Sequence, residues 1–222
     1  MGILTPVKPE VLAVKFIANV SPSLAENMQL HPEVRSVGMF TCNIDDAGYT
    51  AIDEATKHAK VEVVYARSFY AGAAHASGPL SGEFIGIIGG PDPAEVRSGM
   101  EAAFQCLKKD AWFYTADEAG KIAFYPHLIS RTGSYLSKIA GIKEGESLAY
   151  LIAPPLESVF AIDSALKAAD VKVAVWYGPP GETNFGGGLL TGTQSACRAA
   201  CDAFRETVID VARNPQDLAY HL

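Results

Sequence analysis

Asp45 and Asp46 are the residues of this chain whose type and spacing come closest to catalytic chemistry. Two neighbouring carboxyl groups can act as general acid and general base when their surroundings hold their pKa values apart. Adjacent acids in a turn before a helix are more often caps, because their oxygens accept hydrogen bonds from the first free N–H groups of the helix. We therefore interpret the pair as structural.

Other patterns that would indicate an enzyme are missing from the sequence. There is no G-x-S-x-G nucleophile elbow and no G-x-x-x-x-G-K phosphate loop, and the glycines at 186–188 do not continue into a G-x-G-x-x-G pattern. We predict that the chain is not an enzyme.

The cysteines and histidines give little support for a metal ion or another cofactor. The sequence has no C-x-x-C pair, and Cys197 and Cys201 lie four residues apart on one face of a helix of small residues. Such spacing is typical of close helix packing by reduced thiols, whereas a zinc site would need histidines or further cysteines nearby. We expect no metal and no cofactor.

An internal repeat indicates how the elements that carry these residues are organised. Residues 51–66 recur at residues 161–176, with eight of the sixteen positions identical. An offset of 110 residues is the size of a small domain and is too long for a solenoid repeat. We predict two homologous domains, residues 1–110 and 111–222. Each alternates strands and helices, with helices expected at 49–60 and 159–169, which predicts an α/β fold with an α+β sandwich in each half.

The two copies differ most in one loop. Beyond the shared strand the offset falls from 110 to 101 residues, because the first copy carries nine additional residues before Phe84. This loop is rich in glycine, alanine and serine, and its counterpart at 177–184 is shorter. A surface loop that has drifted in sequence would look the same, but long loops in compact domains are uncommon and often functional. Both interpretations stay open.

Charge and composition restrict the partners of the chain. The net charge is −7 over 222 residues, and lysines and arginines are not clustered as nucleic-acid binding requires. No apolar run approaches the roughly 20 residues of a membrane-spanning helix, and the first residues do not resemble a secretion signal. We expect a cytoplasmic protein that binds neither nucleic acid nor membranes, with small cations as the more natural partners.

Several segments resemble the shell domain of bacterial microcompartments. The most specific are residues 53–57, 61–65, 70–75, 130–137 and 153–157. In a standard shell domain a segment like 124–132 closes the domain, whereas here it precedes the rest of the second copy, as in circularly permuted shell domains. The chain is thus similar over nearly its whole length to tandem, permuted shell proteins of the ethanolamine-utilisation type.

This resemblance implies a structural function. Proteins of this kind form homotrimers whose six domains make a pseudohexameric tile, and the tiles pack laterally with other shell proteins into the microcompartment shell. A gated central pore is also implied, through which bulky cofactors could pass when it is open. Its gate residues would come from the loop of the first copy and from its shorter counterpart: Phe69, Tyr70, Gly72, His75, Gly78, Gly82, Gly181 and Glu182. A free trimeric regulatory protein that binds a metabolite is the alternative.

The resemblance also suggests a site for ethanolamine, a small cation with one hydroxyl group. Its recognition needs a carboxylate for the ammonium and is helped by an aromatic face, because cation–π contacts contribute about 0.5–2 kcal/mol. Asp45, before the first repeat helix, and Glu83, at the end of the long loop, are the candidate acids. Trp112 and Phe113, in the linker between the domains, are the candidate aromatic residues. The second copy has no acid at either corresponding position. Solvated acids and a packing aromatic residue are the competing interpretation.

Overall fold

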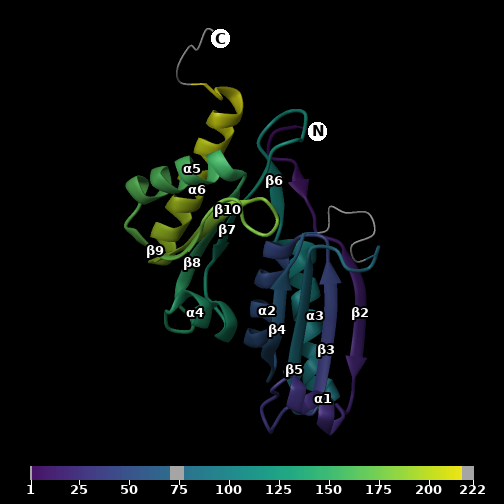
Figure 1. The fold of residues 1–222 in the computed structure, drawn as a ribbon. Coiled ribbons are helices and arrows are strands. Elements are labelled where there is room, and N and C mark those ends of the chain that lie inside the picture. Colours follow the sequence, from purple (N-terminus) through teal and green to yellow (C-terminus); the bar gives the residue numbers. More distant parts are fainter. Residues whose placement is uncertain (1, 71–77, 217–222) are drawn as a thin grey trace.

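The computed structural model describes residues 2–70 and 78–216, and it contains two copies of one arrangement of strands and helices (Figure 1). The first copy consists of β1 (Pro6–Val7), β2 (Val11–Ile17), α1 (Pro22–Asn27), β3 (Ser36–Cys42), α2 (Asp45–His58), β4 (Glu62–Ser68), β5 (Phe84–Gly90) and α3 (Pro93–Lys109). The second consists of β6 (Phe113–Thr115), β7 (Ala123–Ile129), α4 (Ser134–Ala140), β8 (Ser147–Ala153), α5 (Pro155–Ala168), β9 (Val171–Tyr177), β10 (Gly186–Gly192) and α6 (Gln194–Arg213). The identical order confirms the predicted repeat and the α/β fold.

The sheets of the two copies have the same strand order. It is β2-β3-β5-β4 in the first copy and β7-β8-β10-β9 in the second, with antiparallel neighbours throughout. The second sheet is longer, because β6 pairs with β7 and β1 pairs with β6. A strand from the beginning of the chain therefore belongs to the sheet of the second copy, and the domain division at residues 110 and 111 stays a prediction.

In each copy, a layer of two helices packs on one face of the sheet and forms the core. Helices α2 and α3 cover one face of the first sheet, and α5 and α6 cover one face of the second (Figure 1). Large apolar side chains fill both interfaces, among them Phe40 and Phe84 in the first copy and Phe124 and Phe204 in the second. Burying one such side chain contributes about 1.5–3 kcal/mol. The predicted helical face of Cys197 and Cys201 lies in the second of these cores, where both thiols are buried and unpaired.

A third apolar cluster lies on the other face of the second sheet. Tyr125 and Tyr150 are buried in it, and Ile44 and Tyr49 of the first copy pack against it together with α4. The second sheet is therefore covered on both faces, which is why β8 is buried along its whole length. Its counterpart β3 alternates between buried and half-buried residues towards its end, because nothing in the described chain covers its outer face to the same extent.

Several predictions about local structure were wrong. Helix α5 begins at Pro155 and not at residue 159, because a proline is favourable in the first turn of a helix. Helix α2 begins at Asp45 and not near Tyr49, so Asp45 and Asp46 form its first turn, and Ile44 occupies the N-cap position without a side-chain hydrogen bond. The acids are not caps, because their carboxyl groups are turned into the contact between the two copies. Phe113 is not in a linker: it is a buried residue of β6, a strand of three residues that is too short to show a sequence period.

Further features concern membranes and metals. No helix in the described part of the chain is long and apolar enough to cross a membrane. Within residues 2–70 and 78–216, no group of three or more histidine, cysteine, aspartate or glutamate side chains is arranged to hold a metal ion.

Burial raises the pKa of Cys106 and Cys201 to about 12, so these thiols stay protonated at neutral pH.

Candidate functional site

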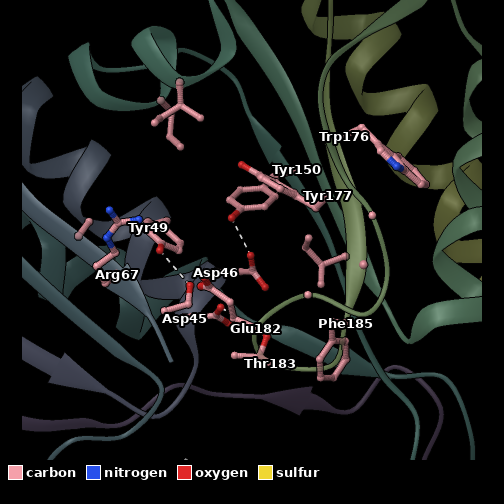
Figure 2. Close-up of a pocket in the computed structure, with 18 of the residues that line it drawn as sticks. Asp45, Asp46, Tyr49, Arg67, Tyr150, Trp176, Tyr177, Glu182, Thr183 and Phe185 are labelled. Atoms are coloured by element: carbon pink, nitrogen blue, oxygen red, sulfur yellow. Dashed lines mark hydrogen bonds between the residues drawn. The ribbon is translucent and has the colours of Figure 1, made fainter. Parts of the chain in front are cut away.

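A cavity of about 530 Å³ lies where the two copies meet (Figure 2). One wall comes from the first turn of α2 and the end of β4, and the other from α4, β8, β9 and the loop between β9 and β10. The lining is acidic and aromatic and contains one arginine; its polar and aromatic members are Asp45, Asp46, Tyr49, Arg67, Ser68, Tyr135, Tyr150, Trp176, Tyr177, Glu182, Thr183 and Phe185.

Asp45 is placed at this cavity by the first turn of α2. The residue is only 8% exposed, and the hydroxyl of Thr183 donates to its Oδ2 atom over 3.5 Å. Ser68 is a second hydrogen-bonding partner, and its Oγ atom shares a hydrogen bond of 2.9 Å with the hydroxyl of Tyr49. Burial raises the pKa of Asp45, while the hydrogen bonds from Ser68 and Thr183 oppose the rise.

Asp46 points into the same contact and is also buried. The hydroxyl of Tyr150 donates to its Oδ1 atom over 2.6 Å (Figure 2). Burial, followed by the charge of Asp45, raises the pKa of Asp46 well above its usual range. Burial and then Asp45 also raise the pKa of Glu83. The charge of Asp45 thus disfavours the charged forms of Asp46 and Glu83, and a bound cation would relieve that repulsion.

Aromatic rings form much of the cavity wall beside these acids. Tyr49 and Tyr135 stack with their ring centroids 6.3 Å apart, which joins α2 of the first copy to α4 of the second. Tyr150 and Tyr177 approach each other at 6.3 Å on the opposite wall. Such rings can stabilise an organic cation through their faces. The cavity therefore combines negative charge with aromatic surface, the chemistry that suits a small amine.

The structure brings together only some of the predicted site residues. Asp45 lines the cavity, and so do Gly181 and Glu182, which the sequence assigned to a gate loop. Glu83 is not part of the lining, although its charge interacts with Asp45. The predicted connection between the ligand site and a gate loop ran through Glu83 of the long loop, whereas it is the shorter loop that lines the cavity.

The two predicted aromatic residues lie elsewhere. The indole N–H of Trp112 donates to the carbonyl of Leu107 over 2.8 Å, and the ammonium of Lys8 lies 4.2 Å from the ring centroid. The face of this ring is therefore already occupied by a cation of the protein itself. Phe113 is buried against Tyr125, with ring centroids 4.9 Å apart, and touches Phe185 edge-on at 5.9 Å. Phe113 supports the cavity wall from behind and does not line it.

The long loop of the first copy is held at its C-terminal end. The Oγ1 atom of Thr41 donates to the carbonyl of Leu80 over 2.5 Å, and the amide of Glu83 donates to the carbonyl of Cys42 over 2.9 Å. Gly82 lies between them with φ at +61°, and a Cβ atom there would come 2.2 Å from Cys42 O, so only glycine fits. Residues 80–83 are therefore anchored on β3.

The other gate positions of that loop have varied surroundings. Tyr70 is well exposed, and the amide of Phe69 donates to the carbonyl of Glu83 over 3.1 Å. Gly78 has a positive φ of +86° with open space around it. Gly72 and His75 lie outside the described residues.

Sequence reasoning missed the tyrosines that complete the site. Tyr150 lies 104 residues from Asp46 in the sequence, and Tyr177 is separated from Tyr49 by more than half the chain. Tyr150 lies in β8, a strand of mostly apolar residues that is buried along its whole length, and Tyr177 is the last residue of β9. A local pattern could not have marked them, because their role depends on how the two copies pack.

Comparison with known proteins gives consistent results. The BMC domain model matches residues 36–119. Over 209 residues the chain is 58% identical to the bacterial microcompartment shell protein EutL of Clostridium perfringens. The matched region covers 94% of this chain and 96% of that protein. The crystal structure of the ethanolamine utilization protein EutL from Leptotrichia buccalis matches with a TM-score of 0.94 at 57% identity, over 98% of this chain and 100% of that one. A trimeric microcompartment shell protein, PduB, shares the fold with a TM-score of 0.75 at 21% identity over 94% of each chain.

Proposed function

We propose that this chain, which belongs to the EutL family of bacterial microcompartment shell proteins, forms a homotrimeric tile in the shell of an ethanolamine-utilisation microcompartment. Its role as a structural shell protein and not an enzyme rests on 58% identity to a shell protein over nearly the full length. The repeat is the observation that carries the tile. Three chains with two similar copies each supply six similar wedges around one axis, and closed cyclic symmetry is usual for homo-oligomers. The tile would lie within the bacterial cytoplasm, beside other shell proteins.

The assembly can be tested on the purified chain. Native mass spectrometry at micromolar concentration should show a species of about 70 kDa, three times the chain mass of 23.6 kDa. Electron microscopy of concentrated protein should then show two-dimensional sheets. A monomer would contradict the trimer, and trimers that never form sheets would favour the free regulatory protein.

A gated central pore is the second part of the proposal. The loops after β4 and β9 follow equivalent strands of the two copies, so six similar wedges around one axis would hold all of them at similar distances from it, and we propose that they surround its centre. The aromatic side chains of Phe69 and Tyr70 are suited to plugging an aperture, and bulky cofactors are the expected cargo of the open state. Since residues 80–83 are anchored on β3, movement of the first loop would have to begin before Leu80.

Ethanolamine is the proposed ligand of the acidic cavity. Asp45 would bind the ammonium with electrostatic help from Glu83, and the hydroxyls of Ser68 and Thr183 beside Asp45 would serve the ligand hydroxyl. Because Gly181 and Glu182 line the same cavity, a bound amine would also contact the shorter gate loop. Such contacts would bias the loop towards the state that binds ethanolamine more tightly.

Calorimetry with ethanolamine tests this site. The wild type should bind with a dissociation constant of about 0.1–1 mM, and Asp45→Asn and Glu83→Gln should each weaken binding at least about tenfold. Glu118→Gln, an exposed acid away from the cavity, and Trp112→Phe, whose ring already faces Lys8, serve as matched controls and should bind normally. Equal heats of binding for the wild type and both acid variants would show that ethanolamine does not bind in this cavity.

A further inference from the structure

We propose that a second cavity between the two copies binds an organic diphosphate of nucleotide size. This cavity has a volume of about 930 Å³ and lies between helices α2 and α3 of the first copy and β7 and α6 of the second. No described residue lines both this cavity and the acidic one. Its volume is within the range of about 300–1,000 Å³ that is typical of small-molecule sites.

The charge of this second cavity points to an anion. Apart from two histidines, its charged lining consists of four cations and two acids: Lys57, Lys109, Arg131 and Arg198 against Glu54 and Asp110. The lining therefore carries two positive charges in excess, although the whole chain has a net charge of −7. A cleft lined mainly by one sign of charge attracts ligands of the opposite sign.

Three of the four cations are available to a ligand. Lys57 forms an ion pair with Glu54, and His58 contacts the same carboxylate at 2.8 Å, so these groups are already engaged. Within residues 2–70 and 78–216, the side chains of Lys109, Arg131 and Arg198 form no salt bridge. Three cations without partners around one cavity are more than a single carboxylate needs, and they suit a diphosphate.

The backbone brings the two arginines to neighbouring positions. The side-chain amide of Gln194 donates to Ser130 Oγ over 3.2 Å, which ties the start of α6 to the residue after β7. Arg131 follows Ser130, and Arg198 lies one turn after Gln194 on the same face of α6. From the other side, the ammonium of Lys57 donates to the carbonyl of Arg131 over 3.0 Å. Planar guanidinium groups fixed in this way match the oxygens of phosphate groups.

Neutral polar groups line the rest of the cavity. The ring of His127 stacks on Tyr125 with the centroids 5.0 Å apart. Burial, followed by the charge of Lys57, lowers the pKa of His127 to about 4, so the ring is neutral at pH 7 and offers one donor and one acceptor. Ser98 and Gln105 of α3 add further hydrogen-bonding groups. A phosphate group alone would leave these residues without a contact, whereas the organic part of a larger ligand could reach them.

The repeat does not account for this positive surface. Helices α3 and α6 begin after the equivalent N-caps Asp92 and Thr193, which sets an offset of 101 residues. At this offset Gln105 corresponds to Glu206, and Lys109 corresponds to Asp210. The same helix positions are therefore acidic in the second copy, although both helices pack on their sheets in the same way. The fold itself does not require the basic residues, which favours a ligand as their reason.

Calorimetry with ADP tests the cavity. At pH 7 and constant ionic strength, the wild type should bind ADP with a dissociation constant of about 10–100 μM. Arg131→Gln and Arg198→Gln should each weaken binding at least about tenfold, because each removes a guanidinium that meets the phosphates. Pyrophosphate should bind more weakly than ADP, and adenosine should not bind.

Controls on the same helices distinguish the cavity from general charge. Lys108→Gln and Arg205→Gln each remove an exposed cation of α3 or α6 that does not line the cavity, and both variants should bind ADP normally. Asp110→Asn should tighten binding about threefold, because it removes the carboxylate of the lining that is not engaged by Lys57. Unchanged circular dichroism spectra show that the variants are folded.

Two results would overturn the proposal. One is the absence of heat from both ADP and pyrophosphate at concentrations up to about 5 mM. The other is equal binding by the wild type, Arg131→Gln and Arg198→Gln, which would place the phosphates elsewhere. Because every lining residue of the cavity belongs to one chain, neither result depends on the trimer, and the proposed function would stand in both cases.

Discussion

Replacing Asp53 by alanine is expected to lower the free energy of unfolding by about 2–5 kcal/mol, because two buried backbone N–H groups lose their acceptor. These amides, of Gly133 and Leu136, donate to the Asp53 carboxylate in buried hydrogen bonds of 2.8 Å at the contact between the two copies. The ammonium of Lys57, 3.7 Å from the same carboxylate, also loses part of its charge partner. Urea denaturation at pH 7 measures the effect.

Two further variants sharpen this measurement. Asp53→Asn keeps one acceptor oxygen and should lose less stability than the alanine variant. Asp202→Ala removes an exposed acid that pairs with Arg205 and should change the free energy of unfolding by no more than about 0.5 kcal/mol. If Asp53→Ala were as stable as Asp202→Ala, the hydrogen bonds from Gly133 and Leu136 to Asp53 could not be important for holding the two copies together.

The general architecture could be predicted from the sequence because its signals are local. The helix and strand of the repeat carry their own apolar periods, and eight identical positions out of sixteen connect the copies without any knowledge of their packing. The same local logic failed at the first turn of α2. Asp45 and Asp46 have the residue type of caps, but their carboxyl groups accept hydrogen bonds from Thr183 and Tyr150 of the other copy, and Asp45 also from Ser68.

The candidate site was predicted in part for the same reason. An acid that lacks a counterpart in the second copy can be recognised by aligning the repeats, and Asp45 was found in this way. The aromatic partners could not be found so, because the choice between Trp112 and Tyr49 depends on which ring faces the cavity. Trp112 was predicted because it lies in a run of three aromatic residues, yet the ammonium of Lys8, the residue after β1, already lies over its ring.

Replacing Asp46 by asparagine should stabilise the protein increasingly as the pH rises from about 4 to 8, by on the order of 1 kcal/mol or more at the upper end. Burial and the neighbouring Asp45 raise the pKa of Asp46 in the folded state. A carboxyl group with a raised folded-state pKa contributes stability that is fully present below its unfolded pKa and is lost as the pH rises through the folded value. Asparagine cannot ionise and so does not lose this contribution. Its Oδ1 atom can still accept the hydrogen bond from Tyr150.

Thermal unfolding of the wild type and Asp46→Asn across this pH range measures the difference between them. Asp202→Asn provides the matched control, since that exposed acid should give a difference that does not grow with pH. A stability difference between wild type and Asp46→Asn that stayed constant or narrowed with rising pH would contradict the raised pKa.

The repulsion between these carboxyl groups also links stability to ligand binding. A cation bound at Asp45 would offset the repulsion among Asp45, Asp46 and Glu83, so ethanolamine should stabilise the wild type more at pH 8 than at pH 5, and should lose much of that pH dependence in Asp46→Asn.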